Sequence, residues 1–219
     1  MSSLIFFDIN GTIIKRDKRT DIPYQKAIDN LLNVENGMNG VDTSARSDKD
    51  VFIEVLDKHG QAFSEEKWNV FLELYKNQLE AFKETDVWRE NADAVSMIKK
   101  LSNTNHKLSL ITGELSIGAR YKLEKLNVWH YFPTGGFGED GLRRFDIAEA
   151  ALKKAKSIYG NDFDDIYVIG DTILDIMTAR HLGAKIISIT TGSNTREELE
   201  AKEPDYIIDC FKEIEYLFL

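Results

Sequence analysis

Acidic and hydroxyl-bearing residues follow three apolar runs of this sequence. Asp8 follows "LIFF", Thr112 and Gly113 follow "KLSLI", and Asp171 ends "DIYVIGD", with Asp175 one helical turn later. If these runs are parallel strands of one sheet, their carboxyl ends meet at the same edge, where ligands bind. We therefore expect these residues to surround one point, although they lie far apart in the sequence.

The residue types at this edge indicate a particular chemistry. The carboxylates of Asp8, Asp171 and Asp175 would repel one another unless a cation lies among them, and hard oxygen ligands of this kind favour Mg²⁺. A magnesium ion in turn favours a phosphorylated substrate, to whose oxygens the Thr112 hydroxyl and the Gly113 N–H would donate. Asp8 would then attack phosphorus and form an aspartyl-phosphate.

Alternating strands and helices are expected to hold these residues in place. From residue 90 onward, short apolar runs alternate with amphipathic segments, which is typical of a parallel sheet covered on both faces. The pattern predicts strands at 107–112, 165–169, 185–189 and 206–208, and helices at 92–101, 117–126, 147–159 and 173–182. The fold class is therefore predicted to be doubly wound, Rossmann-like α/β.

Residues 15–88 show only helical periodicity. Apolar positions recur at helical spacing around Ile28, around Phe52 and from Trp68 to Phe82. The strand ending at Phe7 must pair with strands that arrive only after residue 100. We therefore expect residues 1–14 and 89–219 to form one α/β core, with 15–88 inserted as a helical cap.

Composition limits the class of protein. The 219 residues carry a net charge of −9, which opposes binding to nucleic acid through phosphates. No apolar stretch is long enough for a membrane span, and the single cysteine excludes an intrachain disulfide. We expect a cytoplasmic protein, a monomer or weak homodimer, whose partner is a small phosphorylated metabolite and not nucleic acid or a membrane.

These motifs together resemble the haloacid dehalogenase-like hydrolase superfamily, and within it the Mg²⁺-dependent phosphatases of the phosphoglycolate phosphatase type. "DINGT" matches the first motif, "LITG" the second and "GDTILD" the fourth, while the helical insertion after the first motif matches the family's cap. Within the insertion, "ARSDKDVFIEVL" resembles a segment of phosphoglycolate phosphatase relatives. The resemblance implies a phosphoric monoester hydrolase whose cap controls substrate specificity.

The family's third motif is normally a lysine that steadies the nucleophile and the phosphoryl oxygens. The segment "FGEDGLRRFDIAEAALKKA" offers no lysine before its helix, and Asp146 with Glu149 predicts an N-cap pair there. Arg143 and Arg144 would then precede the helix, where a cation is unfavourable unless an anion offsets it. We assign the phosphate-binding role to Arg144, since a guanidinium binds two oxygens at once; Arg143 remains the alternative.

Asn10 departs from the family pattern. The resemblance implies an aspartate two residues after the nucleophile, which protonates the leaving oxygen and later activates water, and whose main-chain carbonyl ligates the metal. Asn10 keeps the carbonyl and can donate a hydrogen bond, but it cannot carry a proton. We therefore expect a metal site of Asp8, Asn10, Asp171 and Asp175 and catalysis by Asp8, Asn10, Thr112 and Arg144, with impaired turnover.

Two other interpretations of Asn10 stay open: a non-catalytic protein that binds a phosphorylated ligand, and an engineered inactive variant that traps its substrate. A phosphoglucomutase or a dehalogenase is less favoured; against the dehalogenase, Asp171 and Asp175 indicate a metal and hence phosphorus. The substrate itself is not predicted. Arg46, Lys15 or Arg16 would contact its anionic end, with Arg46 preferred among them.

Overall fold

The computed structural model describes residues 2–43 and 46–219, and within them the strands form one six-stranded parallel sheet in the order β3-β2-β1-β4-β5-β6. The strands are β1 (Leu4–Phe7), β2 (Lys107–Ile111), β3 (Gly135–Gly136), β4 (Ile166–Gly170), β5 (Lys185–Ile189) and β6 (Tyr206–Ile208). β1 is central, although it comes first in the chain. The predicted doubly wound α/β fold is confirmed.

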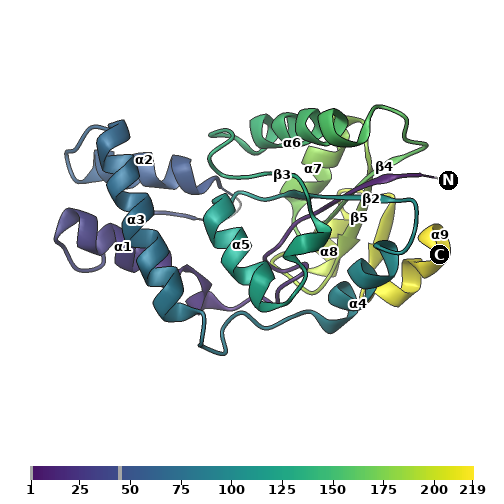
Figure 1. Ribbon diagram of the computed structural model, residues 1–219, viewed down its shortest axis with the longest axis horizontal. Helices are drawn as coiled ribbons and strands as arrows, with labels where there is room; N and C mark the ends of the chain where they lie inside the picture. Colours follow the sequence, from purple (N-terminus) through teal and green to yellow (C-terminus); the bar gives the residue numbers. More distant parts are fainter. Residues whose placement is uncertain (1, 44–45) are drawn as a thin grey trace.

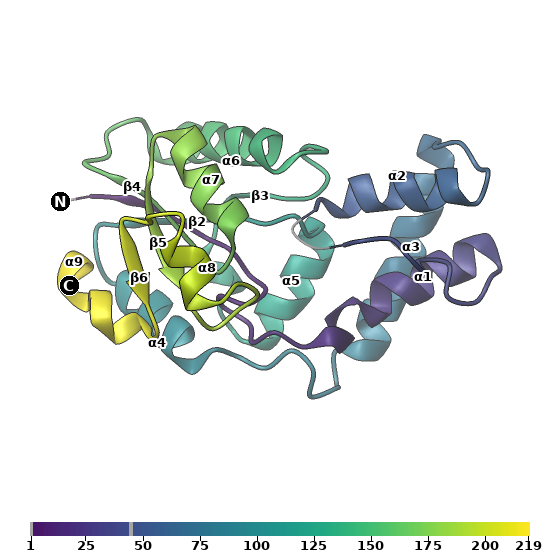
Figure 2. The same ribbon diagram turned by 180° about the vertical axis from the view of Figure 1, so that it is seen from behind.

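Helices cover both faces of this sheet (Figures 1 and 2). Alternation along β1 explains why: Leu4 and Phe6 pack under α6 (Arg144–Tyr159) and α7 (Ile173–Leu182), while Ile5 and Phe7 share a core with α4 (Ala92–Leu101) and α5 (Ser116–Lys125). All four side chains are fully buried. A strand buried on both sides reads as a continuous apolar run, as "LIFF" does.

Short elements complete the core. They are α8 (Arg196–Glu200), α9 (Glu215–Phe218) and the 3₁₀ turns η1 (Lys18–Asp21), η2 (Trp129–Tyr131) and η3 (Phe211–Ile214). None of the helices in the described part of the chain is long and apolar enough to cross a membrane.

The register of the sheet brings the three motif-bearing strands to one edge. Phe7 is paired with Leu110 of β2 and with Ile169 of β4. The residues that follow these strands therefore emerge side by side, and the Asp8 N–H donates to the Ile169 carbonyl at 2.9 Å.

The inserted helices α1 (Ile22–Leu32), α2 (Asp48–Lys58) and α3 (Glu65–Phe82) gather at one end of the molecule, away from α6 and α7 (Figure 1). Their shared core is aromatic. Phe52 contacts Trp68 and Phe71, and Tyr24 meets Tyr75 edge to face with ring centroids 5.6 Å apart. The helical spacing of the aromatic residues on α3 thus reflects packing inside the insertion.

Two adjacent linkers join the insertion to the sheet. Ile14 and Glu90 form an antiparallel bridge, and the Lys15 N–H donates to the Arg89 carbonyl at 2.9 Å. Asn91 fastens the return linker, because its side-chain amide donates to the Thr12 carbonyl at 3.1 Å. The chain thus leaves and re-enters the core at one place, close to the predicted boundaries at residues 14 and 89.

Candidate active site

Asp8 leaves the end of β1 and is buried beneath the edge of the sheet. Burial raises the pKa of Asp8 well above its usual value, and the neighbouring carboxyls of Asp175 and Asp171 raise this pKa further while Arg144 lowers it. A charged Asp8 is therefore costly unless more positive charge reaches it. The site is built around a carboxylate that needs a cation.

Arg144 supplies one such cation from the first residue of α6. Its Nη2 donates to Asp8 Oδ1 at 2.9 Å and to Asp175 Oδ1 at 2.6 Å. Although burial alone would lower the pKa of Arg144, Asp175 and Asp8 raise it, so the guanidinium stays charged. Its Nε is buried and finds no hydrogen-bond acceptor within the described residues. A buried donor without a partner is suited to an oxygen of a bound ligand.

The start of α6 differs from the prediction. Arg143, not Asp146, is the N-cap residue, and the helix begins at Arg144. Asp146 lies in the first turn, where it accepts from the Arg143 main-chain N–H at 3.3 Å and from the Arg143 guanidinium. Arg143 points to solvent, with 80% of its side chain exposed. The two adjacent arginines therefore have different environments, and only Arg144 contacts Asp8.

Asp171 and Asp175 lie on either side of the start of α7. Asp175 accepts from Arg144 at Oδ1 and from the Thr172 hydroxyl at Oδ2, at 2.6 Å in both cases. Asp171 Oδ2 accepts from the Ser193 N–H at 2.5 Å, while its Oδ1 is buried without a partner among the residues described. Gly11, with φ of +93°, allows this crowding, because a Cβ there would lie 2.5 Å from Asp171 Oδ2.

These residues fit a divalent cation. Among residues 2–43 and 46–219, no group of three or more Asp, Glu, His or Cys side chains forms a ready metal cluster. Mg²⁺, however, usually takes one or two carboxylates together with water and substrate phosphate. The orphaned Oδ1 of Asp171 and the Asp8 carboxylate meet that requirement. Both side-chain oxygens of Asp175 are engaged elsewhere, so its direct ligation stays a prediction.

Asp171→Asn should stabilise the metal-free protein. Burial, followed by repulsion from Asp175, raises the pKa of Asp171 from 3.8 to about 6. The folded chain then binds this proton more tightly than the unfolded chain, so the associated stability is present below about pH 4 and is lost as the pH rises through about 6. At pH 7 we expect the variant to gain about 1–3 kcal/mol in free energy of unfolding.

Urea unfolding in EDTA at pH 4 and pH 7 measures this effect, with the exposed Asp162→Asn as the matched control. A gain at pH 7 that shrinks at pH 4 is expected for Asp171→Asn alone. If Asp171→Asn and the unaltered protein had the same free energy of unfolding at pH 4 and at pH 7, the electrostatic account would be contradicted.

Thr112 and Gly113 form the second side of the site. Thr112 is buried, and its Oγ1 accepts from the Glu114 N–H at 3.2 Å, which leaves the hydroxyl proton available. Gly113 faces the insertion: its carbonyl accepts from the Asp48 N–H at 2.8 Å. A Cβ on Gly113 would lie 2.1 Å from the Arg46 carbonyl oxygen, so only glycine allows this close approach.

Asn10 is exposed toward the cavity and has a partner that the sequence analysis missed. Lys122 Nζ donates to Asn10 Oδ1 at 3.2 Å and forms an ion pair with Glu114. Lys122 is 1% exposed and lies on the buried face of α5 with Ala119 and Leu123. A lysine on the apolar face of a helix was the available signal, because lysine is rarely buried without a partner.

One cavity of about 830 Å³ connects these residues to the insertion. Asp8, Asn10, Thr112, Gly113, Arg144, Asp171 and Asp175 all line it, as do Arg16 and Arg46. Arg46 is held by Asp50 at 2.8 Å and by Glu54, and it donates to the Asp42 carbonyl at 3.1 Å. Lys15 does not line the cavity. The predicted site residues are thus brought together, but Arg46 is not free to receive an anion. The segment "ARSDKDVFIEVL" begins at Ala45, which lies outside the described residues.

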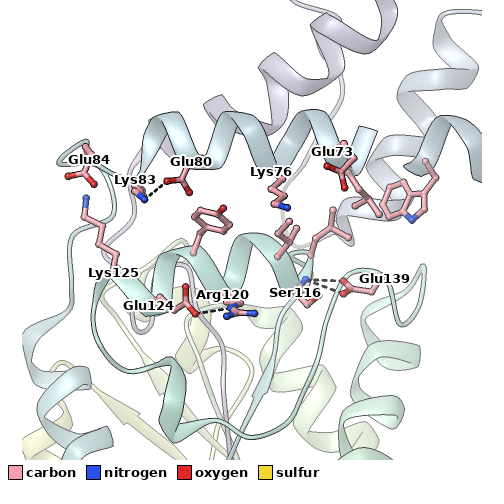
Figure 3. Close-up of a pocket in the computed structure, with 15 residues that line it drawn as sticks. Glu73, Lys76, Glu80, Lys83, Glu84, Ser116, Arg120, Glu124, Lys125 and Glu139 are labelled. Atoms are coloured by element: carbon pink, nitrogen blue, oxygen red, sulfur yellow. Dashed lines mark hydrogen bonds and ion pairs between the residues drawn. The ribbon is translucent and has the colours of Figure 1, made fainter. Parts of the chain in front are cut away.

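A second hollow, of about 1030 Å³, is lined by residues of α3 and α5. Figure 3 shows charged side chains of both helices facing it, including the ion pairs Lys83–Glu80 and Arg120–Glu124. The Ser116 N–H at the start of α5 donates to Glu139 at 3.0 Å. Asp8, Arg144 and Asp171 do not line this hollow, which we call the α3–α5 groove.

Parts of this chain are similar in sequence to known proteins. Residues 146–214 match the family model described as HAD-hydrolase-like. "Probable phosphatase IndB" of Dickeya dadantii is 29% identical over 114 residues, or 52% of this chain and 49% of that protein. "Putative pyrophosphatase PpaX" of Caldanaerobacter subterraneus is 22% identical over 205 residues, or 94% of this chain and 89% of that protein. In residues 146–214 the chain resembles the HAD-like hydrolases.

The fold of this chain is also found among solved structures. The crystal structure of "a predicted phosphoglycolate phosphatase" from Haemophilus somnus superposes with a TM-score of 0.68 at 18% identity, covering 100% of this chain and 98% of that one. Identity at this level indicates a shared fold. The matched family segment begins in the first turn of α6 and includes Asp171 and Asp175, but it does not include Asp8 or Thr112.

Proposed function

We propose that this chain is a Mg²⁺-dependent phosphatase that transfers the phosphoryl group of a small phosphomonoester to Asp8. The observation that carries the proposal is the environment of Asp8: a buried carboxylate at a strand end, in contact with a buried guanidinium that has an unused N–H. The names of the relatives, a phosphatase and a pyrophosphatase, agree with chemistry at phosphorus.

The residues would divide the reaction between them. A carboxylate oxygen of Asp8 attacks phosphorus, the bond from phosphorus to the leaving oxygen breaks, and the leaving alkoxide needs a proton. Arg144 Nε and the Thr112 hydroxyl are suited to bind the phosphoryl oxygens during this transfer. Asp8, Asp171 and the main-chain carbonyl of Asn10 would hold Mg²⁺, which supplies positive charge to the phosphoryl oxygens when it is bound.

Asn10 determines which half-reactions are fast. Its amide cannot give a proton to the leaving oxygen or take one from the water that hydrolyses the aspartyl-phosphate. An aryl phosphate releases a stable phenolate that needs little proton transfer, so the first step should proceed. The second step should be slow, and the phosphorylated protein should accumulate.

Rapid-mixing kinetics with 4-nitrophenyl phosphate and Mg²⁺ tests the proposal. We expect a burst of 4-nitrophenol close to one equivalent per chain, followed by a slow steady state, and we expect Asp8→Asn to abolish both phases. Asp162→Asn, a charge change on the surface, should leave the burst intact. No burst with intact protein and saturating Mg²⁺ would contradict the proposal.

Asn10 also supports a second candidate, a protein that binds a phosphorylated ligand without turning it over. That function predicts saturable binding of phosphomonoesters in the calorimeter and no phosphoryl transfer, even after Asn10→Asp. A burst in either protein excludes it.

A further inference from the structure

The cavity continues from Asp8 past Asn10 to a wall made largely of acidic and phenolic side chains. Asp21, Tyr24, Asp48, Tyr75 and Glu114 line this part, and we call them the leaving-group wall, since the alcohol side of a substrate would face them. All but Glu114 come from the insertion, and Glu114 follows Thr112 and Gly113 at the edge of the sheet. The wall is therefore contiguous with the phosphoryl site.

The acidic groups of this wall lie close enough to affect one another. Burial raises the pKa of Asp48 well above its usual value, and the nearby Glu114 raises it further. Burial also raises the pKa of Tyr75, with Glu114 and Asp48 as the next causes. The surroundings of these groups therefore disfavour negative charge, and they would penalise the carboxylate of a ligand in the same way.

Two cations near the wall, Lys122 and Arg46, already have partners. Lys122 is paired with Glu114 and bonded to Asn10, and Arg46 is paired with Asp50 and Glu54. Arg16 and Lys18 line the cavity too, and both are exposed. An anionic leaving group at the wall would have to displace Lys122 from its buried pair with Glu114, which costs more than breaking a surface pair, or be neutralised by cations whose charge is screened by solvent.

Glu114 supplies the observation that points to a ligand. It is 7% exposed, and while its Oε1 pairs with Lys122, its Oε2 is buried and has no hydrogen-bond partner in the described part of the chain. An unsatisfied buried acceptor costs about 1–3 kcal/mol unless a donor reaches it. A ligand hydroxyl or ammonium in the cavity would satisfy this oxygen.

The α3–α5 groove is a poorer candidate for the alcohol. Its lining carries charges of both signs, and two ion pairs, Lys83–Glu80 and Arg120–Glu124, lie along the helices (Figure 3). No buried side-chain atom lacking a hydrogen-bond partner is found among its lining residues as described. It is also lined by none of Asp8, Thr112 and Arg144.

We propose that the leaving group is an alcohol that donates hydrogen bonds through hydroxyl or ammonium groups and carries no carboxylate or phosphate of its own. The inference rests on the proposed function, because it assumes that the phosphoryl group lies at Asp8. It assigns a substrate class different from phosphoglycolate or pyrophosphate, whose leaving sides are anionic.

Calorimetric titration with three phosphoesters of similar size tests this preference directly. Glycerol 3-phosphate presents hydroxyls, phosphoethanolamine presents an ammonium and phosphoglycolate presents a carboxylate. With Mg²⁺ and the unaltered protein, we expect at least one of the first two to bind at least about tenfold more tightly than phosphoglycolate, since like-charge contacts are strongly penalised. Comparing the affinities for glycerol 3-phosphate and phosphoethanolamine shows whether the wall favours hydroxyl or ammonium groups. Binding of phosphoglycolate as tight as that of both others would overturn the inference.

A charge-neutral variant of the wall provides the mechanism test. Asp48→Asn keeps an oxygen that can accept from the Leu115 N–H, a bond of 2.8 Å. At a pH high enough to ionise Asp48, the substitution should tighten phosphoglycolate by about fivefold or more while changing glycerol 3-phosphate by less than about twofold. Glu73→Gln makes the same charge change in the α3–α5 groove and should alter neither constant. If Asp48→Asn is poorly folded, Asp21→Asn replaces it with the same expectation, because Asp21 lines the wall and its side chain makes no capping hydrogen bond. An unchanged ratio in the folded variant contradicts the role of the wall.

The two proposals fail in different ways. A burst with 4-nitrophenyl phosphate combined with a preference for phosphoglycolate rejects the leaving-group inference and keeps the phosphatase. The expected preference in binding without any phosphoryl transfer, even in Asn10→Asp, rejects the phosphatase and leaves a binding site of the stated selectivity.

Discussion

Asn10→Asp should raise the turnover of alkyl phosphates by about 10²–10⁴, the usual contribution of general acid–base catalysis. The new carboxyl would occupy the position from which Asn10 Oδ1 now accepts from Lys122 at 3.2 Å. No rearrangement of the turn is required, because Gly11 retains its positive φ and its N–H still donates to the Ile14 carbonyl at 2.7 Å.

Lys122 decides which step gains most. An ammonium at this distance favours the charged form of a carboxyl, so an aspartate at position 10 would be more effective as a base than as an acid. Hydrolysis of the aspartyl-phosphate, which needs a base, should therefore accelerate more than the release of an alkoxide, which needs an acid. Quenched-flow measurement of dephosphorylation, beside steady-state turnover of glycerol 3-phosphate, separates the two steps.

Asn10→Gln is the matched control, since it keeps an amide and adds no proton carrier. It should leave both steps at the level of the unaltered protein or below it. If Asn10→Asp forms the phosphorylated protein no faster and clears it no faster than Asn10→Gln, proton transfer at position 10 does not limit this chain.

Arg144→Met should weaken both the fold and the reaction. The substitution removes the guanidinium that contacts Asp8 and Asp175 and leaves two buried carboxyls without that cation. Breaking a buried ion pair by deleting one partner typically costs about 3–5 kcal/mol, and protonation of the two acids should hold the loss near about 3 kcal/mol. The phosphorylation rate should fall by about 10²–10³, because a donor to the phosphoryl oxygens is also lost.

Arg143→Met is a sharp control for that experiment. The two residues are adjacent and alike, yet the Arg143 side chain is 80% exposed whereas that of Arg144 is 8% exposed. We expect the Arg143 variant to change the free energy of unfolding by less than about 0.5 kcal/mol. Equal losses for the two variants, in urea unfolding and in burst rate, would contradict the assignment of Arg144.

The sequence was most informative about the strands, because their hydrophobic pattern determines where they lie in the sheet. The runs ending before Asp8, Thr112 and Asp171 are uniformly apolar, so a buried parallel sheet with one functional edge could be predicted. The start of α6 could not, because Asp146 suits either the N-cap or the first turn, and only its bond to the Arg143 N–H distinguishes them. β3 consists of Gly135 and Gly136, which carry no side-chain pattern at all.

The pairing of charged side chains could not be predicted, for a different reason. Glu114 and Lys122 pair with each other next to Asn10, but nothing in the local pattern says that the fold brings α5 over the first turn. Arg46 has a suitable charge for a substrate anion, and only the structure reveals that Asp50 and Glu54 occupy it. Which charged side chains pair depends on where the folded backbone places them, and this placement cannot be inferred from a single sequence.

Tandem mass spectrometry can locate the phosphoryl group that this mechanism places on Asp8. The unaltered protein would be incubated with acetyl phosphate and Mg²⁺, quenched in acid and digested, with Asp8→Asn treated in parallel. Acetyl phosphate has a good leaving group, so the result does not depend on Asn10 or on the leaving-group wall. We predict one phosphoryl group on the peptide that contains Asp8, labile to hydroxylamine and absent from Asp8→Asn. An unmodified Asp8, or the same modification in Asp8→Asn, would contradict the account.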